Sequence, residues 1–249
     1  MSESMRMWVE VAFNVAYLVV IWGLVLVMIR RRAEVEPARW PLVRLFILAF
    51  GLLALGDTGH VGFRVVAYAQ GSLENASLSI GGTDVGLVGL GALATAITVT
   101  FFYMLMVVIW RTRFDKPYGG PGLLLLAAGV IRLLVMIPPA NDWNAVVPPQ
   151  PWSLIRNFPL IFQGLGVCAL ILRDAFAADD RTFKWIGAMI IASYAFYTPV
   201  ILFVQHAPML GMLMIPKTLA YVAIAVIAFR AFYPQRTGQS AQHTPASTP

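Results

Sequence analysis

Long apolar stretches alternate with short polar or Pro/Gly-rich connections along almost the whole chain. An α-helix needs about 20 mostly apolar residues to cross the hydrocarbon core of a bilayer. The pattern therefore predicts an all-α fold, an integral membrane bundle of seven transmembrane helices that fills residues 1–233. The expected helices are 8–29, 43–68, 85–110, 122–138, 152–172, 184–205 and 208–232. The polar, proline-bearing residues 234–249 are expected to be a disordered cytoplasmic tail.

Composition agrees with a lipid environment. Only 12% of the 249 residues are charged and 59% are hydrophobic, whereas a soluble domain carries roughly a quarter charged residues. The net charge of +6 does not indicate a nucleic-acid partner, because the basic residues flank apolar stretches and form no polar face. We expect a multi-pass protein of the cell membrane whose main partner is the lipid bilayer.

Lysine and arginine fall on alternate connections, and this asymmetry predicts the orientation. Positively charged connections stay in the cytoplasm. The connections 70–84, 139–151 and 205–207 contain no Lys or Arg, so we place them, and the N-terminus, outside and the C-terminus inside. The basic residues on the opposite side are Arg30, Arg31, Arg32, Arg39, Arg44, Arg111, Arg113, Lys116, Arg173, Arg181, Lys184, Arg230 and Arg236.

Polar side chains inside the expected helices are the candidate functional residues, since ionisable groups in a bilayer are costly and usually face the bundle interior. The first two helices each carry a polar stripe, because spacings of three or four residues keep side chains on one helix face. These stripes are Glu10, Asn14 and Tyr17, and Asp57, His60 and Arg64. The later helices add Thr95, Thr98, Arg132, Arg156, Asn157, Gln163, Tyr194, Tyr197, Lys217 and Tyr221.

Depth and orientation together place most of these groups in the outer half of the membrane. We therefore expect a polar cavity that opens outward and is closed below by apolar packing. Its cations outnumber its anions, and unpaired charge at low dielectric is costly unless a ligand supplies the partner. The first hypothesis is a receptor or transporter for a small anionic ligand. Its expected binding residues are Glu10, Asn14, Asp57, His60, Arg64, Arg132, Arg156, Asn157, Tyr194, Tyr197, Lys217 and Tyr221.

Structural roles compete with this interpretation. Arg64 and Arg156 have side chains long enough to reach the outer interface. Asp57 and His60 would form a structural hydrogen-bonded pair within one helix. Thr95 would bond a backbone carbonyl, and the tyrosines would be ordinary core. Glycines near residues 56–62 and 86–91 indicate close helix packing.

Lys217 in the last helix carries a resemblance to a second class of protein. Seven helices, an outside N-terminus and a buried lysine in the seventh helix resemble an opsin, and the run Tyr197–Val200 adds to the resemblance. The resemblance implies retinal as a cofactor bound to Lys217. The chain departs from microbial opsins at Leu213, where an acidic residue is usual, and in having no carboxylate in helix 85–110 after Asp84.

A membrane-embedded enzyme that acts on a lipid or prenyl substrate is the third hypothesis. Asp57 and His60 would serve as an acid/base pair with Glu10 nearby. The resemblance to zinc-dependent seven-helix hydrolases fails on the number of histidines, since a catalytic zinc usually needs three protein ligands. No metal site is expected, and Cys168, alone in an apolar run, is expected to be a buried structural residue.

Overall fold

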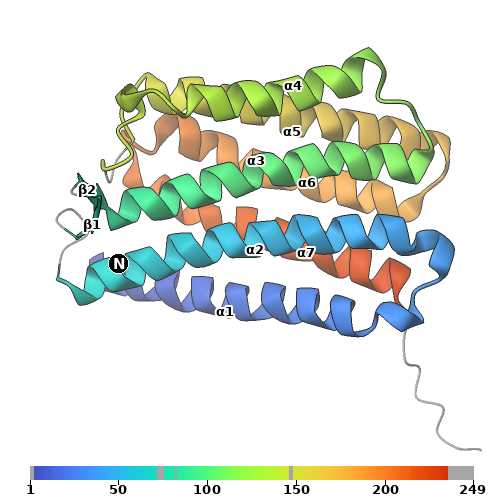
Figure 1. Cartoon of the computed structure of the whole chain (residues 1–249), viewed down its shortest axis with the longest axis horizontal. Helices are drawn as coiled ribbons and strands as arrows, with labels where there is room; N and C mark the ends of the chain where they lie inside the picture. Colours follow the sequence, from blue (N-terminus) through green and yellow to red (C-terminus); the bar gives the residue numbers. More distant parts are fainter. Residues whose placement is uncertain (1–2, 72–75, 82, 146–147, 235–249) are drawn as a thin grey trace, which may run out of the picture.

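Seven long helices run side by side along the long axis of the molecule (Figure 1). The computed structural model describes residues 3–71, 76–81, 83–145 and 148–234. Within them the helices are α1 (Glu3–Arg30), α2 (Trp40–Ala69), α3 (Leu87–Phe114), α4 (Gly119–Val135), α5 (Trp152–Ala177), α6 (Arg181–Phe203) and α7 (Met214–Phe232). Two strands, β1 (Ser77–Ile80) and β2 (Thr83–Gly86), and four 3-10 turns, η1 (Arg32–Glu34), η2 (Pro37–Arg39), η3 (Pro139–Asn141) and η4 (Pro208–Leu213), complete the order.

The helices form a closed ring. Each helix contacts the next along the chain, and α7 returns to contact both α1 and α2. Additional contacts join α3 to α5 across the ring. The N-terminus, the β1–β2 hairpin and the α4–α5 connection lie at the left of Figure 1, and we call this the hairpin end. The α1–α2, α3–α4 and α5–α6 connections lie at the opposite end, so neighbouring helices are antiparallel.

Six helices in the described ranges are long and apolar enough to cross a membrane: α1, α2, α3, α5, α6 and α7. Large apolar side chains point outward from them, such as Val19, 69% exposed, and Phe158, 70% exposed. Continuous apolar surface of this kind is stable against lipid and not against water. The chain is therefore a multi-pass membrane protein. The one long helix outside this set of six is α4. It has 17 residues, about 25 Å of helix, which is shorter than the roughly 30 Å hydrocarbon core.

The connection between α2 and α3 differs from the polar loop expected there. Ser77–Ile80 and Thr83–Gly86 pair as an antiparallel hairpin, and Gly81, at a φ of 60°, supplies the left-handed conformation that a tight turn needs. The beginning of α7 also differs, because residues 208–213 form the 3-10 turn η4 and the helix starts only at Met214. Of the expected tail, residues 235–249 lie outside the described residues.

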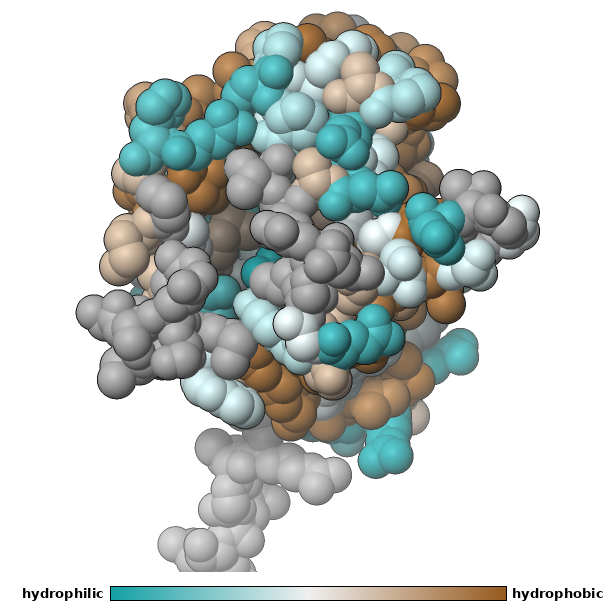
Figure 2. Space-filling view, turned by 90° about the vertical axis from the view of Figure 1, so that its left-hand side faces the viewer, coloured by the Kyte–Doolittle hydropathy of each residue, from teal (hydrophilic) through white to brown (hydrophobic). Residues whose placement is uncertain are grey.

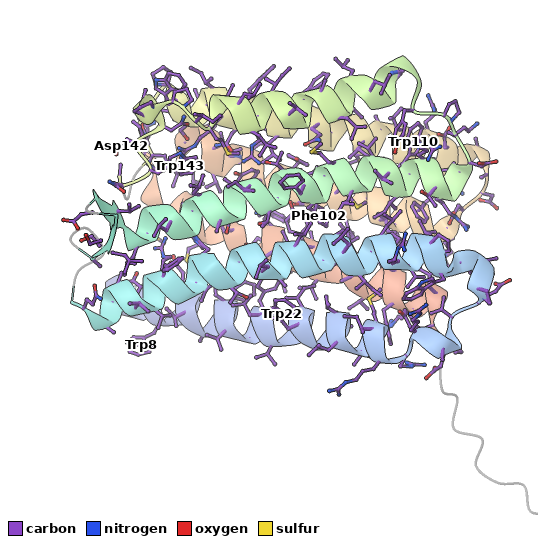
Figure 3. The ribbon with its side chains drawn as sticks, in the orientation of Figure 1. Trp8, Trp22, Phe102, Trp110, Asp142 and Trp143 are labelled. Atoms are coloured by element: carbon purple, nitrogen blue, oxygen red, sulfur yellow. The ribbon has the colours of Figure 1, made fainter. Side chains whose placement is uncertain are left out.

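The half of the bundle away from the hairpin end is closed by aromatic packing. Phe46 and Phe50 of α2 are fully buried, with ring centroids 6.4 Å apart. Phe102 of α3, labelled in Figure 3, packs edge-on against Phe50 at 5.7 Å. Phe183 of α6 and Phe232 of α7 lie 6.2 and 5.8 Å from Phe46. Four helices therefore share one apolar plug, as the sequence predicted for this half.

The end of α7 is fastened to α1. The Tyr233 hydroxyl donates a hydrogen bond of 2.7 Å to the carbonyl of Met28, and Arg31 donates to the carbonyl of Pro234 at 2.8 Å. The Arg31 guanidinium also lies over the rings of Phe229 and Tyr233. Burial raises the pKa of the Tyr233 hydroxyl to about 12, so it remains a protonated donor at neutral pH. These contacts close the ring between the first and last helices.

Glycines let α2 and α3 approach closely. A Cβ at Gly56 would lie 1.8 Å from Thr98 Oγ1, and a Cβ at Gly91 would lie 2.8 Å from the Cα of His60. Any side chain there would force the two helices apart, so the expected packing role holds at Gly56 and Gly91. Gly62 has no atom within 4 Å of its Cβ position and takes no part in this contact.

Candidate functional site

Asp57 bridges three helices inside the ring. From α1, the Tyr17 hydroxyl donates a hydrogen bond of 2.8 Å to Asp57 Oδ2. From α3, the Thr95 hydroxyl lies 3.4 Å from Asp57 Oδ1 and 3.1 Å from the carbonyl of Gly56. Tyr17 therefore donates to one carboxylate oxygen, whereas the single Thr95 proton has two possible acceptors, the expected backbone carbonyl, which is nearer, and Asp57 Oδ1.

Lys217 lies in the first turn of α7 and points into the ring. Its ammonium nitrogen is 4.8 Å from the ring centroid of Tyr197 and 5.1 Å from that of Tyr221. It interacts electrostatically with both Asp57 and Arg132. Across the described ranges, no carboxylate oxygen lies within 4 Å of this nitrogen. The amine is thus held by aromatic faces with no carboxylate in ion-pair contact.

Tyrosines join Lys217 to the middle of the bundle. The hydroxyls of Tyr103 and Tyr221 are 2.9 Å apart and hydrogen-bonded. The Tyr194 ring lies 5.6 Å from that of Tyr103 and 6.5 Å from that of Tyr197, between centroids. Tyr194 also donates to the carbonyl of Leu160 on α5 at 2.9 Å. Tyr103 was missed by the sequence reasoning, and its one signal was a phenol in the middle of an apolar stretch.

Arg132 is the interior cation of α4 and is only 2% exposed. Its guanidinium donates to Thr100 Oγ1 at 2.6 Å, to the carbonyl of Ala96 at 2.9 Å and to that of Arg156 at 3.1 Å. Neutral acceptors from α3 and α5 therefore hold this charge, and Thr100 is a second residue that sequence reasoning missed. No carboxylate of the described chain forms an ion pair with it.

The α4–α5 connection covers the hairpin end, and residues 139–145 are here called the cap segment. Arg156 donates to the carbonyl of Asn141 at 3.2 Å, and its guanidinium lies 4.3 Å from the ring of Trp143. Asn144 Oδ1 accepts a 2.9 Å bond from the backbone N–H of Gly86. Trp143 and Asp142 lie beside the beginning of α3 in Figure 3. Arg156, 7% exposed, is therefore buried under the cap segment and does not extend to the interface, as the competing structural interpretation had it.

The remaining predicted residues occupy two other places. Glu10, Asn14 and Arg64 line a small pocket between α1 and α2 near the hairpin end. His60 packs toward α3, and its Nδ1 is buried without a hydrogen-bond partner in the described structure. It forms no hydrogen bond with Asp57, whose oxygens are taken by Tyr17 and Thr95. The expected structural pair of Asp57 and His60 is therefore absent from the described contacts.

Asn157 and Gln163 of α5 are buried between helices. The Tyr197 hydroxyl lies 3.3 Å from Asn157 Oδ1, and Asn157 Nδ2 donates to the carbonyl of Ser153. Gln163 donates to the carbonyl of Leu125 on α4 at 3.0 Å, and its Oε1 is buried without a partner within the described ranges. Tyr197 is thus the link between Lys217 and α5.

These residues form one assembly, which we call the central cluster. Its members come from all seven helices and are Tyr17, Asp57, Thr95, Thr100, Tyr103, Arg132, Arg156, Asn157, Tyr194, Tyr197, Lys217 and Tyr221. Figure 2 views the hairpin end, where hydrophilic residues lie on the face and at its edges, among apolar ones. Within the part of the chain described, no group of three or more His, Cys, Asp or Glu side chains could hold a metal ion.

The central cluster combines interior cations, phenol hydroxyls and one carboxylate under a backbone cap. Such a set can hold an anionic group by charge and by hydrogen bonds from hydroxyl donors, and its amine can act as a nucleophile toward an aldehyde. Comparison with known proteins adds no assignment to this chemistry: no protein-family model, no curated protein and no solved structure matches the chain.

Proposed function

We propose that this protein is a receptor or transporter of the cell membrane that binds a small anion in the central cluster. One observation carries the proposal: Arg132, Arg156 and Lys217 lie inside the helix ring, and none of them forms an ion pair with a carboxylate in the described residues. A buried charge without a partner costs several kcal/mol, roughly, even after the surrounding structure relaxes. A bound anion would remove that cost.

The charges of the central cluster favour an anion beside Lys217. Asp57 is its carboxylate, and its two oxygens face the hydroxyls of Tyr17 and Thr95 at 2.8 and 3.4 Å. Lys217 and Arg132 interact with each other electrostatically, and as like charges they repel. An anion between them would attract both cations and offset their mutual repulsion. A surrounding tyrosine hydroxyl that exchanges its present acceptor for the anion would donate to its oxygens.

A receptor or transporter agrees better with the packing than an open channel does. The aromatic plug of Phe46, Phe50 and Phe102 fills the half of the bundle away from the hairpin end. The cap segment covers the other side of the central cluster through Trp143 and Asn144. If the hairpin end faces outward, as the distribution of Lys and Arg predicts, the ligand reaches the central cluster from the outer half of the membrane.

A thermal-shift titration of the purified protein tests the proposal. Acetate, benzoate and inorganic phosphate are the probes, and an anion at 100 times its Kd stabilises the folded protein by about 2.7 kcal/mol. We expect at least one probe to raise the Tm of the wild type and to lose this effect in Lys217→Met. Lys184→Met is the matched control, because Lys184 lies in the first turn of α6, at the end opposite the hairpin end, and pairs with the exposed Asp179. Equal shifts in wild type and Lys217→Met, or no shift with any probe, would contradict the proposal.

Retinal binding through Lys217 is the second candidate. It is favoured by an amine that rests on the rings of Tyr197 and Tyr221 and interacts with the carboxylate of Asp57 without touching it. The same Lys217→Met variant decides it. Retinal added to the wild type should then produce a visible absorbance band that Lys217→Met lacks, since an imine bond to the retinal aldehyde, formed with loss of water, needs the amine. The enzyme hypothesis gains no support, because Asp57 and His60 share no hydrogen bond.

A further inference from the structure

An apolar groove lies between α5 and α6 on the outside of the bundle. Its volume is about 460 Å³, which is in the range of about 300–1,000 Å³ typical of small-molecule sites. Phe158 on its rim is 70% exposed, whereas Ile201 at its base is 6% exposed. The groove is lined by Leu154, Ile155, Phe158, Ile161, Ile201 and Leu202. Every lining side chain is apolar, so the groove suits a hydrocarbon chain.

Two residues of the central cluster lie on the same helices as the groove lining and close to it in sequence. On α6, Tyr197 lies one turn before Ile201, and on α5, Asn157 is the neighbour of Phe158. The barrier at this level is the hydrogen bond between Tyr197 and Asn157, which at 3.3 Å is long. Lys217 lies against the Tyr197 ring at 4.8 Å. A molecule seated in the groove is therefore one aromatic ring away from the interior cation.

Both helices that border the groove carry a proline at this level. Pro159 lies in α5 and Pro199 in α6. A proline inside a helix removes one backbone hydrogen bond and weakens the helix locally. Each proline lies within two residues of a residue that lines the groove, Phe158 or Ile201, so both helices are weakened beside it. The side chains of Tyr197 and Asn157 can then move apart at a place where the backbone hydrogen bonding of α5 and α6 is already interrupted.

We propose that the ligand of the central cluster is a single-chain amphiphile with an anionic head, drawn from the bilayer between α5 and α6. Its hydrocarbon chain lies in the groove, and its head replaces the contact between Tyr197 and Asn157 and meets Lys217 and Arg132. Charge complementarity supports this occupant, because uncompensated cations lie directly behind an apolar groove that opens to lipid. The inference rests on the proposed anion site and names its ligand class.

A series of straight-chain carboxylates tests the inference on the full chain in lipid nanodiscs. With the membrane-partitioned concentration held equal, the affinity for wild type should rise from butyrate to dodecanoate. A chain that already lies in lipid gains little hydrophobic free energy on entering the groove, so the rise reflects packing against the groove lining and is smaller than the about fourfold per CH2 of transfer from water. Leu202→Trp narrows the groove and should remove the gain from chain length while leaving butyrate binding unchanged. Leu123→Trp is the control, since Leu123 is an apolar α4 residue that is 58% exposed.

A photoreactive dodecanoate with a diazirine on its chain supplies an independent measurement. Labelled peptides should come from Leu154–Ile161 and Ile201–Leu202, and labelling there should fall in Lys217→Met, which cannot hold the head. Binding of butyrate and dodecanoate with equal affinity, both dependent on Lys217, would overturn the amphiphile and leave the anion site standing. Labelling spread evenly over all lipid-facing helices would also overturn it. If neither acid binds, the proposed function fails as well.

Discussion

Replacing Gly89 by alanine should release the cap segment from the bundle. Gly89 lies in the first turn of α3, directly under the backbone of Trp143. An added Cβ would lie 1.8 Å from the Trp143 carbonyl oxygen and 2.6 Å from its carbonyl carbon. Backbone atoms cannot rotate away as the end of a side chain can. The cap segment must therefore move by more than 1 Å, since contacts below 3.0 Å are essentially never observed.

The cost follows from the contacts that this movement breaks. Asn144 loses its 2.9 Å hydrogen bond from Gly86, and Trp143 loses its 3.1 Å bond to the carbonyl of Met136. Each neutral hydrogen bond contributes about 0.5–1.5 kcal/mol. The stacking of Arg156 on Trp143, at 4.3 Å, contributes about 0.5–2 kcal/mol more. We expect a loss of about 1.5–5 kcal/mol, which lowers the Tm of a chain of this size by roughly 3–20 °C.

Thermal unfolding in detergent measures the loss, and amide hydrogen exchange locates it. In Gly89→Ala, the amides of residues 141–145 should exchange faster while those of α2 stay unchanged. Gly62→Ala is the matched control, because no atom lies within 4 Å of its Cβ position and alanine favours a helix by up to about 1 kcal/mol. Equal melting temperatures for the two variants, or unchanged exchange at residues 141–145, would refute the account of the cap segment.

Two further predictions concern the half of the bundle away from the cap segment. Trp110→Phe removes the 2.8 Å hydrogen bond from its indole N–H to Asp174 Oδ2. A hydrogen bond to a charged group contributes about 1.5–3 kcal/mol. The Tm of Trp110→Phe should therefore fall clearly below that of the control Trp185→Phe, whose site is 51% exposed. Similar melting temperatures for the two variants would show that the bond is dispensable. Cys168 is 2% exposed, so a water-soluble maleimide should label it only after unfolding, as mass spectrometry would report. Rapid labelling of the folded protein would mean that the packing around α5 is open.

Much of the central cluster could be predicted from the sequence because of the cost of charge in lipid. Asp57, Arg132 and Lys217 stand out as ionisable residues in apolar stretches, and in the structure Lys217 interacts electrostatically with the other two. Thr100 and Tyr103 could not be found in this way. A hydroxyl in an apolar helix can bond its own backbone, so its presence alone does not reveal whether a partner from another helix approaches it.

Helical periodicity assigns residues to a face but does not show which neighbour that face meets. Asp57 and His60 share one stripe of α2, yet Asp57 bonds Tyr17 and Thr95 while His60 packs against Gly91. The role of Arg156 was likewise undetermined, because a long side chain near a helix end can reach either the interface or the interior. Its contact with Trp143 depends on how residues 139–145 fold back over the bundle.

The sequence by itself determined that the chain is a bundle of apolar helices in lipid. Its apolar stretches are long and carry so few charges that they are stable only when lipid surrounds them. Tertiary structure alone decided the closure of the ring between α1 and α7, the hairpin before α3, the cap segment and the groove between α5 and α6. Each of these depends on how helices rotate and pack against one another. Contacts between residues far apart in the chain fix this rotation and packing, such as those of Tyr17 with Asp57 and of Arg132 with Thr100.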